Sequence, residues 1–308
     1  MSILIAGGAG FIGSHLIDEL LKINETVICV DNFVLGNINM ISHNLSNPNF
    51  LFYEIDICDK SKLGNLFMEH KFTRVYHLAA NSDIQSGGYD PSIDFNNSFM
   101  TTMILLDIMR EYEVKEFLFA SSSAIYGEKN ELLSENTGNL QPISYYGASK
   151  LASEAFISAY ASMNSMRANI IRFPNVVGPR LTHGVVYDFI NKLRRNKNEL
   201  EILGDGRQEK PYLYVIDLVE AIMLMQYEKE LDIYNVGVET VTTVNSIANI
   251  VCEVMGLSDV NYSYTGGTSG WQGDVPKFQY DLSKIHSIGW KAKYSSDEAV
   301  QLAARSMI

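Results

Sequence analysis

Residues 2–13 read Ser2-Ile-Leu-Ile-Ala-Gly-Gly-Ala-Gly-Phe-Ile-Gly13, and this stretch decides the fold of the first half of the chain. Its first five residues are a short apolar run, typical of a buried parallel strand. Residues 14–21 continue with apolar side chains at helical spacing. Glycines between a strand and a helix let the backbone turn tightly and approach a phosphate group; here they are Gly7, Gly10 and Gly13. The stretch predicts a strand, a phosphate-binding turn and a helix.

An acidic residue ends the next predicted strand. That strand covers residues 26–30, and Asp31 follows it, 18 residues after Gly13. A carboxylate at this point can bind both ribose hydroxyls of an adenosine, and it repels a 2′-phosphate. A turn followed by a helix-capping aspartate is the alternative. The glycine turn and Asp31 together favour NAD over NADP as the cofactor.

Composition and charge narrow the function classes. The chain has 308 residues, 46% hydrophobic and 19% charged, as in an ordinary globular enzyme. A net charge of −12 and a pI of about 5.0 argue against binding to nucleic acid or to an anionic membrane. Cys29, Cys58 and Cys252 have neither a metal-ligand nor a disulfide spacing, so we expect no metal. The N-terminus resembles a strand rather than a signal peptide, and no apolar run approaches about 18 residues, so a cytoplasmic location is expected.

The first part of the chain alternates short apolar runs with segments of helical spacing. Further strands are predicted at residues 50–55, 74–78, 116–120 and 168–173. This alternation predicts an α/β fold with a Rossmann-type, doubly wound parallel sheet.

The composition becomes less regular after Pro179. A strand near residues 233–236 and a helix at residues 244–255 are predicted there. We expect a cofactor-binding domain at residues 1–175 and a smaller α/β substrate lobe at residues 176–308, with segments of the two interleaved near residues 210–240.

Several residues should gather at the carboxyl edge of the sheet, where open parallel sheets bind their ligands. Asp56 follows the third strand and is placed near an adenine, although it could instead cap the next helix. Ala79 and Ala80 follow the fourth strand and are small enough for a ribose to pack closely. His77, within that strand, is interpreted as a core residue. The fifth strand ends in three serines, residues 121–123, which favour a functional edge.

Tyr146 and Lys150 are four residues apart, so they share one face of a helix. An ammonium group near a phenol favours the phenolate, which suggests a reactive tyrosine. Beside the pair, apolar residues recur at helical spacing and predict the buried stripe of the helix: Ala148, Leu151, Ala152, Ala155, Phe156 and Ala159.

Taken together, the motifs resemble the extended short-chain dehydrogenase/reductase family, in the branch that modifies nucleotide sugars. The motifs are Gly7-x-x-Gly10-x-x-Gly13, Asp31, Asp56-Ile57, His77-Leu-Ala-Ala80, Ser122 before Tyr126-Gly127, Tyr146-x-x-x-Lys150 and Arg172-Phe-Pro-Asn-Val176. The resemblance covers essentially the whole chain. It implies that Tyr146 is the catalytic base, that Lys150 holds the nicotinamide ribose and lowers the pKa of the tyrosine, and that Ser122 hydrogen-bonds the reacting oxygen.

The resemblance also implies the contacts of both ligands. Residues expected at NAD are Gly7, Gly10, Phe11, Ile12, Gly13, Asp31, Asn32, Asp56, Ile57, Leu78, Ala79, Ala80, Asn97, Tyr146, Lys150 and Phe173. Residues expected at a nucleotide-diphosphate sugar are Ser122, Ser123, Asn175, Arg180, Arg207 and Lys210. The chain departs from its relatives where they often have arginine, at Lys210 and near Ser269. Lysine offers a point charge without bidentate geometry, so Arg180 or Arg207 is expected to bind the diphosphate.

One position narrows the reaction. Related sugar 4,6-dehydratases carry an Asp-Glu pair where this chain has Ser123 and Ala124. Related decarboxylases tend to carry a glutamate, and 3,5-epimerase/reductases a cysteine, at the position of Ala124. Alanine can perform none of those steps, which leaves oxidation at C4 of the sugar. A nucleotide-sugar 4-epimerase of the UDP-galactose type is favoured. The alternatives are a C4 dehydrogenase that releases a keto sugar and NADH, a non-catalytic NAD(H) redox sensor, and a structural partner in a larger complex.

Relatives commonly pair as homodimers through a four-helix bundle. The corresponding helices here are expected at residues 97–112 and 147–163, and the first of them is rich in apolar residues. Packing into the core of one chain would explain that composition equally well.

Overall fold

A computed structural model describes residues 1–308, apart from the side chain of Ser86. The chain divides into two compact units. Unit 1 comprises Met1–Ile125, Tyr145–Arg172 and Met225–Tyr234. Unit 2 comprises Tyr126–Ser144, Phe173–Leu224 and Asn235–Ile308. Each unit is therefore assembled from separated segments of the sequence.

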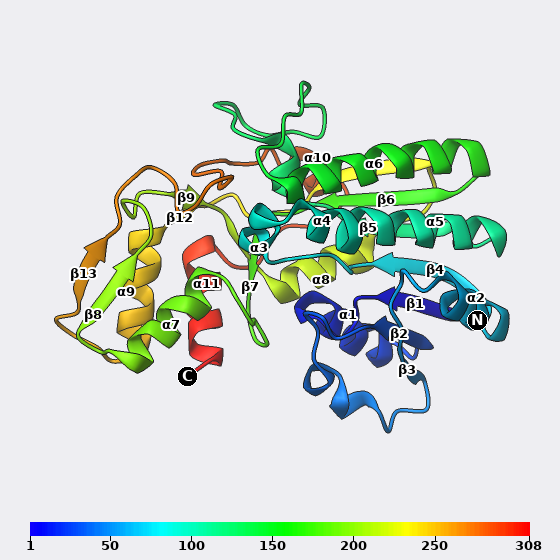
Figure 1. Ribbon diagram of the computed structural model, residues 1–308, viewed down its shortest axis with the longest axis horizontal. Helices are drawn as coiled ribbons and strands as arrows, with labels where there is room; N and C mark the ends of the chain where they lie inside the picture. Colours follow the sequence, from blue (N-terminus) through cyan, green and yellow to red (C-terminus); the bar gives the residue numbers. More distant parts are fainter. The chain divides into compact units, whose positions relative to one another are not determined.

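Unit 1 is built on a seven-stranded sheet of order β11-β6-β5-β4-β1-β2-β3 (Figure 1). The strands are β1 (Ser2–Ala6), β2 (Val27–Asp31), β3 (Phe50–Glu54), β4 (Phe72–His77), β5 (Glu116–Ala120), β6 (Arg167–Arg172) and β11 (Leu231–Asn235). The pairs formed among β1 to β6 are parallel. The order changes direction at β1, because β2 and β4 lie on its two sides, as in a doubly wound sheet. The predicted Rossmann-type α/β fold is confirmed.

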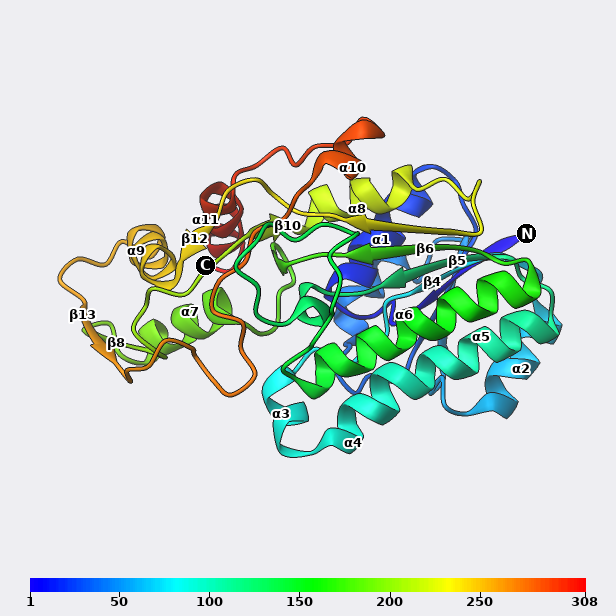
Figure 2. The ribbon, with the colours of Figure 1, turned by 90° about the horizontal axis from the view of Figure 1, so that it is seen from above.

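Helices cover both faces of this sheet. Helix α1 (Phe11–Lys22) packs on β1 and β2. On the other face, α2 (Lys60–Glu69), α5 (Thr101–Glu111) and α6 (Tyr145–Asn164) lie side by side (Figure 2). The apolar core between the layers includes Leu4, Val30, Val75, Phe117 and Ile170 from the strands.

The segment that precedes α5 differs from the continuous helix predicted over residues 97–112. Two short helices, α3 (Ile84–Tyr89) and α4 (Pro91–Asp94), lead into a π-helical turn at Phe95–Met100, and only then does α5 begin. Hydroxyl groups stabilise this wider turn, because the side chains of Thr101 and Thr102 both donate to the Ser98 carbonyl, at 3.1 and 2.9 Å.

The buried face of α6 is not the predicted apolar stripe. Ala148, Ala155, Phe156 and Ala159 are exposed, and Leu151 and Ala152 are only partly buried. The face that packs on the sheet carries small and polar residues: Gly147, Ser149, Lys150, Ser153, Glu154, Ile157 and Ala161. The apolar spacing therefore predicted the wrong buried face of α6, because the helix buries the face that carries Lys150.

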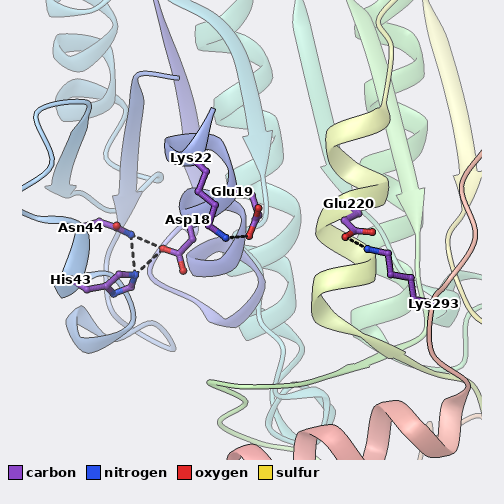
Figure 3. A network of polar contacts seen from close by, with 7 residues as sticks. All are labelled: Asp18, Glu19, Lys22, His43, Asn44, Glu220 and Lys293. Atoms are coloured by element: carbon purple, nitrogen blue, oxygen red, sulfur yellow. Dashed lines mark hydrogen bonds and ion pairs between the residues drawn. The ribbon is translucent and has the colours of Figure 1, made fainter. Parts of the chain in front are cut away.

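Unit 2 contains three two-stranded sheets. They pair β7 (Asn175–Val177) with β10 (Tyr212–Tyr214), β9 (Glu209–Lys210) with β12 (Thr242–Thr243), and β8 (Glu199–Ile202) with β13 (Asn261–Tyr264). The helices are α7 (Val185–Arg195), α8 (Val215–Leu224), α9 (Val244–Val254), α10 (Ser283–Ser287) and α11 (Ser296–Ser306). Helices α7, α9 and α11 enclose a core that includes Phe189, Val251 and Val300. An exposed ion pair joins Lys293 to Glu220 of α8 (Figure 3). Among the described residues, no helix is long and apolar enough to cross a membrane.

Candidate active site

The glycine turn after β1 is packed so closely that a side chain does not fit at Gly7 or at Gly13. Gly7 has a φ of +81°, and a Cβ there would lie 2.5 Å from the backbone nitrogen of Ala79. A Cβ on Gly13 would lie 2.4 Å from the Gly7 carbonyl oxygen. Gly10 is the N-cap of α1 and supplies no side-chain cap. The first N–H groups of α1 therefore have no acceptor from a cap, which suits an anion such as a pyrophosphate.

Asp31 ends β2 and is 8% exposed. Its carboxylate accepts hydrogen bonds from the backbone N–H groups of Ala9 (3.0 Å) and Phe33 (2.9 Å). Burial raises the pKa of Asp31, whereas these N–H groups act in the opposite direction. The backbone N–H of Asn32 also acts on this carboxylate. A carboxylate has about four lone-pair positions, so at least one remains to accept a ribose hydroxyl.

The segment after Asp31 is fastened to its surroundings. Phe33 has a left-handed backbone with a φ of 58°, and its ring lies 5.1 Å from that of Phe52 on β3. Further along, His43 and Asn44 bind the Asp18 carboxylate of α1 at 2.8 and 2.6 Å (Figure 3). These contacts fix the segment after Asp31, which borders the predicted adenosine site.

Asp56 is exposed beside this segment, and its carboxylate accepts hydrogen bonds from the Asn32 amide at 3.2 Å and the Cys58 N–H at 2.8 Å. The alternative in which Asp56 caps the next helix is wrong, because Asp59 is the N-cap of α2 and accepts from the Lys62 N–H. The neighbouring Ile57 is buried.

The residues after β4 lie beneath the glycine turn. Leu78 donates its N–H to the Ala6 carbonyl at 2.9 Å, and Ala79 is the residue that a Cβ on Gly7 would strike. His77 is fully buried, and its Nε2 lies 3.0 Å from the Thr102 hydroxyl, as expected of a core histidine. Three features together fit a dinucleotide: the N-terminus of α1 without a side-chain cap, the close-packed glycine turn, and the buried carboxylate of Asp31.

Ser122 and Tyr146 meet within unit 1. Ser122 follows β5, is 9% exposed, and accepts a hydrogen bond from the Ala124 N–H at 3.2 Å. Tyr146 lies in the first turn of α6, where burial raises its pKa to about 12, the Ser122 hydroxyl lowers it, and the charge of Asp94 raises it further. The predicted lowering of the tyrosine pKa is therefore not a property of these side chains alone, because burial disfavours the phenolate more than its neighbours stabilise it.

Lys150 lies one turn along α6 and is 2% exposed. Its ammonium donates to the Ala120 carbonyl at 2.6 Å, lies 4.7 Å from the ring centroid of Phe119, and lies 5.8 Å from that of Tyr146. Burial lowers the pKa of Lys150 to about 7, although the charges of Asp94 and Glu154 act in the opposite direction.

Two buried carboxylates at this edge were missed by the sequence interpretation. Glu154 binds the guanidinium of Arg172 through both oxygens, and Ser121 donates to it at 2.5 Å. Asp94 ends α4 and is 1% exposed. The spacing offered one usable signal, since Glu154 follows Lys150 by four residues and so shares its helix face. Nothing in the local sequence distinguishes Asp94.

Other predicted residues lie elsewhere. Asn97 is partly buried in the π-helical turn, and its carbonyl accepts from Thr101 at 3.2 Å. Ser123 begins a 3₁₀ turn, Ser123–Tyr126. Phe11 and Ile12 begin α1, and Ala80 follows β4, all in unit 1. Five predicted residues belong to unit 2: Phe173, Asn175, Arg180, Arg207 and Lys210.

In unit 2, Asn175 begins β7, and Arg207 is exposed in a turn. Lys210, by contrast, is largely enclosed. Its ammonium pairs with the buried carboxylate of Asp274 and lies 5.4 Å from the ring centroid of Trp271. Its charge is therefore already compensated within the chain.

Comparison with known proteins identifies the family. The profile of the NAD dependent epimerase/dehydratase family matches residues 3–237. A Methanocaldococcus jannaschii protein whose assigned activity is UDP-glucose 4-epimerase is 33% identical over 306 residues, 97% of this chain and 96% of the relative. UDP-glucuronic acid decarboxylase 2 of Arabidopsis thaliana is 28% identical over 314 residues, 99% of this chain and 68% of the relative.

A crystal structure gives the same result. The UDP-glucose 4-epimerase of Thermotoga maritima, determined with UDP-glucose, superimposes with a TM-score of 0.89 at 33% identity. The match covers 100% of this chain and 98% of that one. With its fold, its glycine turn and the Tyr146/Lys150 pair, the chain belongs to the NAD dependent epimerase/dehydratase family.

Proposed function

We propose that the protein is a nucleotide-sugar 4-epimerase, which oxidises C4 of the sugar and reduces it again from the opposite face. The observation that carries the proposal is the meeting of Tyr146, Ser122 and Lys150 in unit 1, with Ala124 as the only side chain at the position from which elimination or decarboxylation would be assisted. The similarity to enzymes assigned as UDP-glucose 4-epimerases supports it.

Each side chain has a separate task in this reaction. Tyr146 takes the proton of the C4 hydroxyl and later returns one to the same oxygen, while the Ser122 hydroxyl hydrogen-bonds that oxygen. Lys150 contributes a positive charge close to the phenol. When bound, NAD⁺ supplies a hydride acceptor and a positive ring. Because Tyr146 has a pKa of about 12 in the protein alone, that second positive charge is needed to bring the phenolate within reach of neutral pH.

The side chain of Ala124 excludes the two neighbouring reactions of the family. Dehydration and decarboxylation each need an acid or a base beside the keto sugar, and a methyl group provides neither. The residue is partly buried, and its N–H is used to orient Ser122. Oxidation and re-reduction at C4 need no group at this position.

For the nucleotide end we propose that Arg207, with Arg180, binds the diphosphate. Lys210 is committed to Asp274, whereas Arg207 is exposed and can form a bidentate contact with phosphate oxygens.

A panel of UDP-, GDP-, CDP- and dTDP-sugars tests the reaction. Products are identified by NMR while NADH is followed by absorbance. An isomer formed without net NADH is the expected result. Accumulation of NADH with a 4-keto sugar would indicate a C4 dehydrogenase instead, and the absence of turnover with every sugar would contradict both.

Asp31→Ala is expected to weaken NAD binding about tenfold or more, because a charge-assisted contact to the ribose hydroxyls is lost. Binding of NADP relative to NAD should improve, since no carboxylate repels its 2′-phosphate. Calorimetric titration with both dinucleotides measures the change. Glu54→Ala is the matched control, because Glu54 pairs with Asp31 across β2 and β3 but is exposed. An unchanged preference between NAD and NADP in Asp31→Ala would show that Asp31 is not the ribose ligand.

We also propose a homodimer formed through α5 and α6. Phe156 is 43% exposed on α6 and Phe95 is 52% exposed at the start of the π-helical turn, with the Phe99 ring 5.5 Å from that of Phe156. Sedimentation equilibrium is expected to give twice the chain mass of 34.5 kDa. Phe156→Glu should reduce it to the mass of a single chain, whereas Ile23→Glu, on a 58% exposed residue at the C-terminal end of α1, serves as the control.

A further inference from the structure

Lys150 places an ammonium group in the interior of unit 1. The residue is 2% exposed, and its ammonium donates to the Ala120 carbonyl and lies 4.7 Å from the ring centroid of Phe119. Neither of these carries a charge. A buried ammonium persists only where an opposite charge compensates for lost water. Two buried carboxylates act on Lys150 through their charge: Asp94 at the end of α4, a helix that packs against α6, and Glu154 on the helix of Lys150 itself.

Glu154 is already engaged. Its Oε1 accepts hydrogen bonds from Nε of Arg172 at 3.0 Å and from the Ser121 hydroxyl at 2.5 Å. Its Oε2 accepts from Nη2 of Arg172 at 2.6 Å. With both partners 5% exposed or less, this is a self-contained ion pair whose charges cancel. The charge of Glu154 therefore acts on Lys150 less strongly than that of Asp94.

Asp94 is not engaged in this way. Its Oδ1 accepts one hydrogen bond, from the side-chain amide of Asn81 at 2.9 Å. Its Oδ2 is buried and accepts none from any residue that the structure describes. Gly87 leaves the space for this oxygen, because a Cβ there would lie 2.1 Å from it. No arginine or lysine forms an ion pair with Asp94 in the described part of the chain, and α4 packs against α6, the helix of Lys150.

The other titratable groups around the pair do not supply the missing charge. His77 on β4 faces Lys150, but burial and the lysine charge both hold the pKa of His77 well below its ordinary value, so it is neutral. Tyr146 on α6 is neutral until it reacts. Asp83 faces Asp94 and acts on it as a like charge.

We propose that Asp94 is the counter-ion of Lys150 and a positioning residue of the oxidation step: its buried, half-bonded carboxylate keeps the lysine ammonium charged beside Tyr146. Its role in turnover rests on the proposed function, whereas its effect on Lys150 does not.

The sign of the effect follows from the charges. A negative neighbour raises the pKa of both an amine and a phenol, and Asp94 acts in this direction on Lys150 and on Tyr146. Replacing Asp94 by asparagine, which keeps the shape and the contact to Asn81, should therefore lower both pKa values. Lys150 then loses its proton below neutral pH.

The direct test is an NMR titration of protein labelled with ¹³C at lysine Cε, without cofactor or substrate. The Lys150 resonance is assigned as the one missing from Lys150→Met. Its midpoint is expected near pH 7 in the parent and about one pH unit or more lower in Asp94→Asn. Asp94→Ser, which removes the charge with a smaller side chain, should show the same change and replaces Asp94→Asn should that variant not fold.

Two controls separate this effect from a general loss of structure. Asp94→Glu restores the charge and should bring the midpoint back toward that of the parent. Asp90→Asn removes a carboxylate from the same helix, where it is exposed and caps the N-terminus, a task that asparagine performs equally well. Asp90→Asn should leave the Lys150 midpoint unchanged. A folded Asp94→Asn or Asp94→Ser protein with the parental midpoint would overturn the proposal.

The second arm measures kcat against pH with the best sugar of the panel. Both limbs of the profile should move to lower pH in Asp94→Asn, while Asp90→Asn retains the parental profile. A profile that stays in place in Asp94→Asn would contradict the role in turnover. If no sugar is turned over, the proposed function fails, and the NMR titration still decides the role of Asp94.

Discussion

Tyr146→Phe is expected to lower kcat on the preferred nucleotide sugar about a thousandfold, within the range for loss of a general base. The phenyl ring keeps the packing of the first turn of α6, and only the hydroxyl that exchanges a proton with C4 is lost. Because we propose that the glycine turn and Asp31 supply most of the contacts to NAD, loss of the single Tyr146 hydroxyl should leave the dissociation constant of NAD within about twofold of the parent. Product formation is measured by NMR and NAD binding by calorimetry.

Tyr145→Phe is the matched control for this experiment. Tyr145 precedes Tyr146 in the same helix but is 52% exposed, and it has no part in the proposed reaction. Its kcat should equal that of the parent. A Tyr146→Phe enzyme that retains more than about a tenth of the parental kcat would mean that another group removes the proton.

Arg172→Met is expected to lower the free energy of unfolding by about 3–5 kcal/mol, the usual effect of leaving a buried charge unpaired. Arg172 and Glu154 are 4% and 5% exposed, so the orphaned carboxylate has no water to replace the guanidinium. Urea denaturation, compared at equal m-value, gives the difference.

Two further variants make this result interpretable. Arg167→Met removes an arginine from the same strand, where it pairs with Glu116 at 2.9 Å but is 46% exposed, and it should cost less than about 1 kcal/mol. The double variant Glu154→Leu/Arg172→Met leaves no unpaired charge and should recover most of the lost stability. If Arg172→Met proves as stable as Arg167→Met, the buried Arg172–Glu154 pair does not stabilise the packing of α6 on the sheet.

The correct interpretations from sequence are those in which the evidence was local. The strand at residues 116–120 matches β5 in full, because five consecutive apolar or half-buried residues suffice to mark a central parallel strand. The glycine turn was readable because only glycine tolerates the approach of Ala79 to Gly7. The strand predicted at residues 2–6 matches β1 in full as well. The ends of the other predicted strands differ by one or two residues, as at β2 and β6, since strand ends depend on pairing partners.

The errors arose where several elements meet. The apolar stripe of α6 was assigned to the core because apolar spacing usually marks the buried face, yet this helix buries Lys150 and Glu154 and exposes Phe156. Polar residues can be buried there because Ala120 and Arg172, at the ends of β5 and β6, and Ser121, directly after β5, supply their partners.

The sequence by itself determined the sheet, the phosphate-binding turn, Asp31 and the Tyr146/Lys150 pair, since each depends on neighbours within a few residues or on a regular period. Only the tertiary structure decided the charges around that pair. Burial places the pKa of Tyr146 at about 12 and that of Lys150 at about 7, and it brings Asp94, more than fifty residues earlier in the chain, to face them both. A pKa depends on distance through space and on the exclusion of water, and neither quantity is written in the order of the residues.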